Sequence, residues 1–115
     1  KEVADEYRLI NMDEIRVSLE ECFSRKWYSY PATVENQLAN NPEEYVLAHF
    51  DEILQCEIAF FNCHPGFLDG DLLQYSSLNA ARIRDLEMVT SPKIKGQIQK
   101  HQIELISVKE FMETR

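Results

Sequence analysis

The run IAFFNCHPG at residues 58–66 decides the fold prediction, because its first six residues are almost all apolar. A strand that is covered on both faces in a parallel sheet has such a composition, since neither face meets water. The apolar run then breaks off at His64-Pro65-Gly66, and Pro-Gly is a strong signal for a turn. The residues therefore predict a buried strand over Ile58–Cys63 that ends in a turn at His64.

A helix is predicted directly before this strand. Asn41 offers an N-cap, Pro42 suits the first helical position, and Glu44 completes a capping box. The apolar residues that follow share one helical face: Val46, Leu47, Phe50, Ile53 and Leu54. These signals predict a helix from Pro42 to about Gln55. A helix, a buried strand and a turn in this order are typical of an α/β fold.

Weaker signals predict the remaining elements. Before the Pro42 helix these are a helix from about Met12 to Ser24, a short strand or loop at Tyr28–Tyr30, and a short helix through Leu38 that Thr33 caps. After the turn they are a loop at Phe67–Ser77 and a helix that Asn79 can cap, bearing Ile83, Leu86 and Met88. A second helix starts at Ser91-Pro92, and a strand at Ile103–Val108 and a short helix near Lys109–Met112 follow.

The predicted sheet is incomplete. Two strands joined by helices form one right-handed crossover unit, and a strand covered on both faces needs neighbours on both edges. We therefore expect a third strand, self-association with a partner chain or a missing N-terminal portion to complete the sheet. The chain also begins at Lys1 without a methionine, inside a predicted helix. Residues 1–115 are accordingly interpreted as a single α/β region that is a piece of something longer.

Composition excludes several classes of protein. A length of 115 residues fits one domain, and a net charge of −8 without clustered Lys and Arg argues against nucleic-acid binding. No apolar run approaches the roughly 18 residues that a membrane span requires. Cys22, Cys56 and Cys63 show no spacing typical of a disulfide framework. A reducing, cytoplasmic location without nucleic-acid or membrane partners is therefore predicted.

His64 is the candidate functional residue. In parallel α/β folds, sites lie beyond the carboxyl ends of the strands, where His64 is predicted to lie. Pro65 restricts His64 to an extended backbone, and Gly66 leaves room for a ligand or another backbone. An imidazole near neutral pH can donate or accept a proton or bind a metal. Spacing alone leaves two interpretations equally open: a chemical group presented to a cleft, or a turn residue bonded to a neighbouring loop.

A metal site within this chain alone is not predicted. Cys63 and His64 are adjacent and would point to opposite sides of an extended strand, and Cys56 and Cys63 match no zinc spacing. His49 lies near the apolar stripe of its helix, which favours a structural role over metal ligation. His101 fits a favourable charge at a helix C-terminus.

Several short motifs carry a resemblance to a known family. They are CHPGF at residues 63–67 with Asp69, Ser76-Ser77, Arg82, RDLE at 84–87, TSP at 90–92 with Lys95, and HQIELIS at 101–107. Together they resemble the C-terminal part of the YdjC-like carbohydrate deacetylases, a family that includes chitooligosaccharide deacetylase. The resemblance extends from about Ile58 to Phe111.

The resemblance implies the C-terminal portion of a (β/α) barrel-like deacetylase fold, with an incomplete parallel sheet and covering helices. It also implies that a divalent metal, Mg or Zn, is held by an Asp and two His and activates water for attack on the N-acetyl carbonyl of an amino sugar or oligosaccharide. Those ligands belong to motifs of the N-terminal half of the family, which this chain lacks. The isolated chain is therefore expected to bind no metal and to be inactive.

The same resemblance suggests roles for three residues. His64 matches the family's HPG histidine, which is implied to protonate the departing amine, and Phe67 and Asp69 are candidates for lining the sugar site. The leading hypothesis is the C-terminal part of a metal-dependent carbohydrate deacetylase, a hydrolase of an amide bond. Two alternatives stay open: a noncatalytic sugar-binding or interaction module without the metal site, and a plain α/β domain whose turn is structural.

Overall fold

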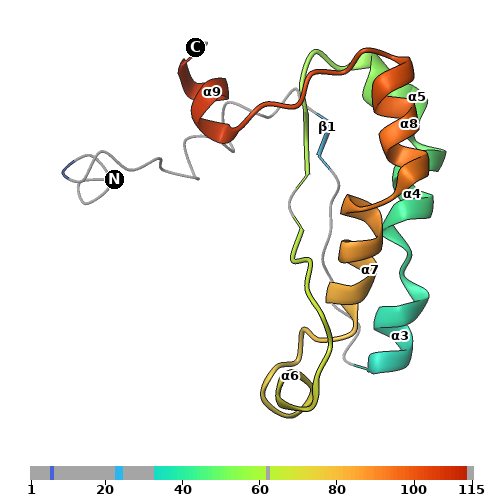
Figure 1. The fold of residues 1–115 in the computed structure, drawn as a ribbon, viewed down its shortest axis with the longest axis vertical. Helices are drawn as coiled ribbons and strands as arrows, with labels where there is room; N and C mark the ends of the chain where they lie inside the picture. Colours follow the sequence, from blue (N-terminus) through green and yellow to red (C-terminus); the bar gives the residue numbers. More distant parts are fainter. Residues whose placement is uncertain (1–5, 7–22, 25–32, 62, 114–115) are drawn as a thin grey trace.

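The computed structural model describes residues 6, 23–24, 33–61 and 63–113. Most of these residues lie in helices around a short strand pair (Figure 1). The elements in chain order are β1 (Phe23–Ser24), α3 (Val34–Ala39), α4 (Pro42–Ala48), α5 (Phe50–Gln55), β2 (Ala59–Phe60), α6 (Gly70–Tyr75), α7 (Ala81–Val89), α8 (Pro92–Lys100) and α9 (Val108–Glu113).

The two strands form a parallel pair in which Phe23 lies opposite Ala59 and Ser24 opposite Phe60. The predicted helix over Met12–Ser24 is therefore wrong at its end, and the rest of it lies outside the described residues, as does the segment Tyr28–Tyr30. Periodicity cannot distinguish a short apolar strand from a buried helical turn, and here the pairing with β2 decides.

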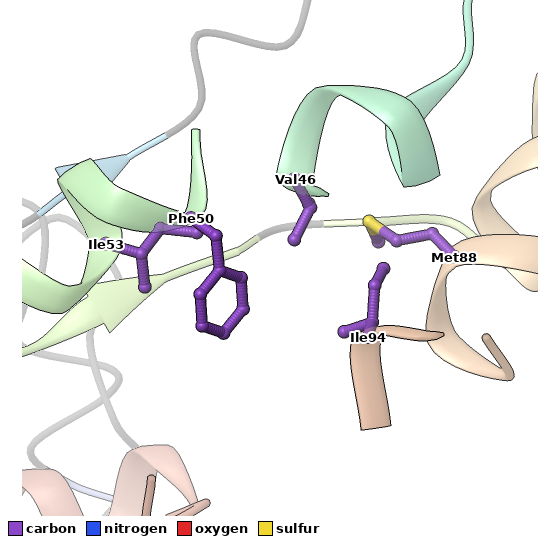
Figure 2. Close-up of a cluster of buried hydrophobic side chains, with 5 residues drawn as sticks. All are labelled: Val46, Phe50, Ile53, Met88 and Ile94. Atoms are coloured by element: carbon purple, nitrogen blue, oxygen red, sulfur yellow. The ribbon is translucent and has the colours of Figure 1, made fainter. Parts of the chain in front are cut away.

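The segment around β2, residues 58–61 and 63, is called the β2 segment below. Its side chains are covered on both faces, although the strand itself is shorter than the predicted Ile58–Cys63. Ala59, Phe61 and Cys63 pack against a core cluster that Figure 2 shows, made of Val46, Phe50, Ile53, Met88 and Ile94 from α4, α5, α7 and α8. Ile58 and Phe60 pack instead around Phe111 of α9. This alternation has the period of two that an extended chain imposes. Figure 1 shows α9 on one side of this segment and α4, α5, α7 and α8 on the other.

The helix predicted over Pro42–Gln55 begins as expected but is divided at His49. The side chain of Asn41 accepts a hydrogen bond from the Glu44 N–H at 3.2 Å, which caps α4. At its other end, Nδ1 of His49 bonds to the Tyr45 carbonyl at 2.8 Å, the same oxygen that accepts the His49 main-chain N–H. A side chain that enters the hydrogen-bond ladder kinks a helix, and α5 restarts at Phe50.

Helix α3 is fastened to the start of α7 through Gln37, which is only 1% exposed. Its Nε2 donates to the Ser77 carbonyl at 2.8 Å, and its Oε1 accepts from the N–H groups of Asn79 and Ala81, each at 3.1 Å. The predicted cap of α3 at Thr33 is confirmed, since its hydroxyl accepts from Asn36 N–H. These contacts fix the start of α7 relative to α3.

Two predictions after the turn are wrong. The predicted loop Phe67–Ser77 contains helix α6, whose start is capped by Asp69. The predicted strand Ile103–Val108 is not a strand, and its Leu105 is 76% exposed. An apolar run becomes a strand only where a partner edge is available.

Of the helices predicted after the loop, α8 and α9 are confirmed, whereas α7 forms without the expected Asn79 cap, because its N-cap is Ala80, which makes no side-chain cap hydrogen bond. Ser91 caps α8 as expected, through a bond from the Ile94 N–H to its hydroxyl. Ser107 and Glu110 form a reciprocal capping box at α9. Hydrogen bonds from Ser107 lower the pKa of the Glu110 carboxyl, and the bond from the Ser107 main-chain N–H has the larger effect. Across the described part of the chain, no helix is long and apolar enough to cross a membrane.

Candidate functional site

The turn His64-Pro65-Gly66, called the HPG turn below, follows the carboxyl end of β2. Strand β2 ends at Phe60, and His64 is half-buried. The main-chain N–H of His64 donates a hydrogen bond to Oδ2 of Asp85, in helix α7, at 2.8 Å. A side chain from a neighbouring helix therefore holds the residue that carries the imidazole.

A second bond joins the HPG turn to the same helix. The Gly66 N–H donates to the Arg82 carbonyl at 3.1 Å. The Arg82 side chain is itself fixed, because its Nε donates to the Leu78 carbonyl at 3.0 Å. Positions three apart lie on one face of a helix, so the Arg82 and Asp85 positions present two attachment points to the turn.

Gly66 leaves less open space than the sequence suggests. A Cβ at this position would lie 3.7 Å from Cδ and 3.8 Å from Cβ of Arg82, which is ordinary van der Waals contact. No described glycine has a positive φ. The neighbour that approaches Gly66 is therefore the aliphatic part of Arg82.

Cys63 lies beside His64 but in different surroundings. Its side chain packs against the core cluster, and burial, followed by the negative charge of Asp85, raises the pKa of its thiol. A thiol with a raised pKa is protonated at neutral pH and is a poor nucleophile and a poor metal ligand. Cys63 therefore serves as a small apolar group, as predicted for cysteines in apolar surroundings.

Phe67 and Asp69 lie just after the HPG turn. Phe67 is 85% exposed, so its ring is open to solvent. Asp69 uses its carboxylate to cap α6, since Oδ1 accepts from the Leu72 N–H at 2.8 Å. Their role in lining a sugar site stays a prediction.

The other two histidines make contacts within the helical layer. The His49 ring stacks on Tyr45 with centroids 4.0 Å apart, which agrees with the structural role expected for it. The His101 ring lies 5.7 Å from that of Phe50, at the C-cap of α8. Among the residues that the structure describes, no group of three or more His, Cys, Asp or Glu side chains is placed to hold a metal ion.

Asp85 is the residue that sequence reasoning missed. The predicted apolar face of its helix carried Ile83, Leu86 and Met88, but the buried residues of α7 are Asp85 and Met88. A carboxylate on a helix face that also carries buried apolar residues needs a hydrogen-bond donor, because an unpartnered buried charge is costly. The signal in the sequence is that Asp85 lies three residues before Met88, on the same helix face as this buried apolar residue.

The chain is similar to part of one known enzyme. Over 49 residues it is 40% identical to a carbohydrate deacetylase from Clostridium beijerinckii (strain ATCC 51743 / NCIMB 8052). The matched stretch is 43% of this chain and only 20% of that protein. No protein-family model matches this chain, and no solved structure matches it at a significant level. The similarity supports a relationship to carbohydrate deacetylases, and it does not reach the finer YdjC-like grouping.

Proposed function

We propose that this chain is the C-terminal part of a metal-dependent carbohydrate deacetylase of the YdjC-like kind, and that His64 is its contribution to catalysis. The observation that carries the proposal is the 40% identity to a carbohydrate deacetylase over 49 residues. The place of His64 beyond the carboxyl end of a parallel strand supports it, because sites in α/β folds lie there.

In the proposed reaction, the imidazolium of His64 donates a proton to the amide nitrogen of an N-acetyl amino sugar. As the carbon–nitrogen bond breaks, this proton makes the nitrogen leave as an amine rather than as an amide anion. Water adds its oxygen to the acetyl carbon as that bond breaks, so acetate and a free amino sugar are the products. The turn contributes by holding the main chain of His64 at a fixed distance from helix α7.

The described residues do not fit a metal site of their own, since they hold no cluster of three ligands. The proposal therefore assigns the divalent metal, Mg or Zn, to the N-terminal half of the family, whose ligand motifs this chain lacks. The parallel pairing of β2, whose side chains pack on both faces, supports the companion proposal that this is a portion of a (β/α) barrel, completed by an N-terminal half or by self-association.

The test is acetate release from N-acetylated chitooligosaccharides by a protein that carries this chain with its upstream sequence. His64→Ala is expected to lower kcat by about 10²–10⁴-fold, the usual contribution of general acid catalysis. His101→Ala is the matched control, since His101 is exposed and lies at the end of α8, and it should leave kcat unchanged. Full activity in His64→Ala would rule out the catalytic role.

A second candidate function is a noncatalytic module that binds sugars or another partner. Two exposed aromatic rings favour it, since Phe67 is 85% and Tyr75 is 78% exposed, and such rings can stack on a sugar. This candidate predicts that the longer protein binds N-acetylated oligosaccharides in calorimetric titration and releases no acetate. Acetate release that depends on His64 would exclude it.

A further inference from the structure

Asp85 is a buried acid that accepts a hydrogen bond from His64, the candidate catalytic residue. Asp85 is 5% exposed, and its Oδ2 accepts a hydrogen bond from the His64 N–H at 2.8 Å. A hydrogen bond between an amide and a carboxylate is charge-assisted, and is about twice as strong as a neutral one. Breaking it would leave a negative charge buried without this donor, which is costly. The bond therefore restrains the turn strongly.

The two links between α7 and the HPG turn differ in kind. The Gly66 link ends on the main-chain carbonyl of Arg82, so it survives any change of side chain on the helix. The Asp85 link depends on a side chain, and it acts on the residue from which the imidazole projects. The position of His64 relative to α7 thus depends on the identity of residue 85.

Helix α7 is a rigid base for this restraint. Gln37 holds the N–H groups of Asn79 and Ala81 at its start, and Met88, one turn after Asp85, packs in the core cluster shown in Figure 2. The charge of Asp85 also reaches Cys63, where it contributes to the raised pKa of the thiol. The carboxylate is therefore close to both residues at the end of the β2 segment.

We propose that Asp85 is a positioning residue, which fixes the main chain of His64 by accepting its N–H and so holds the imidazole in place for proton donation. The catalytic consequence rests on the function proposed above, whereas the restraint itself is a property of this chain. Asp85 acts through His64 and does not touch the substrate.

The restraint is measured by amide hydrogen exchange in the 115-residue chain, as the ratio of the His64 rate to the Gly66 rate. Asp85→Ala should raise this ratio about tenfold or more, because a hydrogen bond to a charged group is lost at His64 alone. Asp85→Asn keeps an acceptor oxygen in the same place and should leave the ratio within about threefold of wild type. If Asp85→Ala does not fold, the exchange ratio is measured in Asp85→Asn instead.

Met88→Ala is the matched control for lost stability. It changes a residue of the same helix with similar burial, 6% exposed against 5% for Asp85, that packs in the core cluster. It should speed exchange at both amides together and leave their ratio unchanged. A ratio that Asp85→Ala does not change would overturn the proposed restraint.

The catalytic consequence is measured in the longer protein by acetate release. Asp85→Ala should lower kcat by about 10–100-fold with little change in KM, since misplacement of a catalytic group affects the chemical step. Asp85→Asn should restore most of that loss. In a His64→Ala background, Asp85→Ala should cost less than about threefold, because a positioning residue has nothing left to position.

Three results would overturn the catalytic role: equal losses in Asp85→Asn and Asp85→Ala, a full further loss in the His64→Ala background, or no acetate release by the wild-type protein. The last result would overturn the proposed function as well. The exchange ratio still decides, in that case, whether Asp85 holds the turn. The two failures are thereby distinguished.

Discussion

The residues on either side of Gly66 differ in how the rest of the molecule holds them. The HPG turn is bonded to α7 through His64 and Gly66, whereas the segment that follows carries Phe67 at 85% and Tyr75 at 78% exposure. Figure 1 shows helix α6 of this second segment at one end of the molecule, away from the other helices. A group that must keep its place during a reaction belongs on the bonded side, and a surface that meets a ligand belongs on the exposed side.

The largest difference in stability between the two regions is expected at Gln37, whose side chain accepts hydrogen bonds at the start of α7, the helix that holds the HPG turn. Gln37→Ala leaves the Asn79 and Ala81 N–H groups without their acceptor and opens a cavity, so it should lower the free energy of unfolding by about 2–4 kcal/mol. Urea denaturation measures this loss. Gln74→Ala, at an exposed glutamine of α6, is the matched control and should cost less than about 0.5 kcal/mol. Similar losses in the two variants would erase the contrast between the regions.

A smaller and local effect is expected at the cap of α6. Asp69→Ala removes the acceptor for the Leu72 N–H, and loss of an N-cap costs about 1 kcal/mol. Faster amide exchange within α6, with unchanged exchange in α7, would show the effect to be local. Asp69→Asn keeps a good cap and should exchange like the wild type. If exchange in α7 accelerates equally, the exposed segment is coupled to the bonded one and the comparison fails.

The sequence predicts those parts of this comparison that depend on local chemistry. The caps at Thr33, Asn41 and Ser91 were found because each needs only a side chain and an N–H a few residues away. The cap at Asp69 uses the same chemistry, but Asp69, Gly70 and Asp71 are also typical loop residues and lie in the predicted loop Phe67–Ser77. Turn and cap residues overlap in type, so short helices are easily missed.

The remaining parts depend on contacts between distant residues, which spacing does not reveal. Strand β1 exists because Phe23 and Ser24 pair with β2, whereas Ile103–Val108 forms no strand pair among the described residues. The bond between Asp85 and the His64 N–H likewise joins residues 21 positions apart. The position of His64 after the strand could be predicted from the sequence, but the acid that holds it could not.

The smallest expected effect on stability, and the sharpest test of the exposed side, is at Phe67. Because its ring is 85% exposed, Phe67→Ala should change the free energy of unfolding by less than about 0.5 kcal/mol. If the ring stacks on a sugar, the same variant should weaken oligosaccharide binding by up to about tenfold, as loss of an aromatic contact does. Leu105→Ala is the matched control, since Leu105 is 76% exposed but lies between α8 and α9. Unfolding curves and calorimetric titration of the longer protein would give both quantities. Unchanged sugar binding in Phe67→Ala would remove the ligand role from Phe67 and leave Asp69 and Tyr75 as the candidate sugar contacts of the exposed segment.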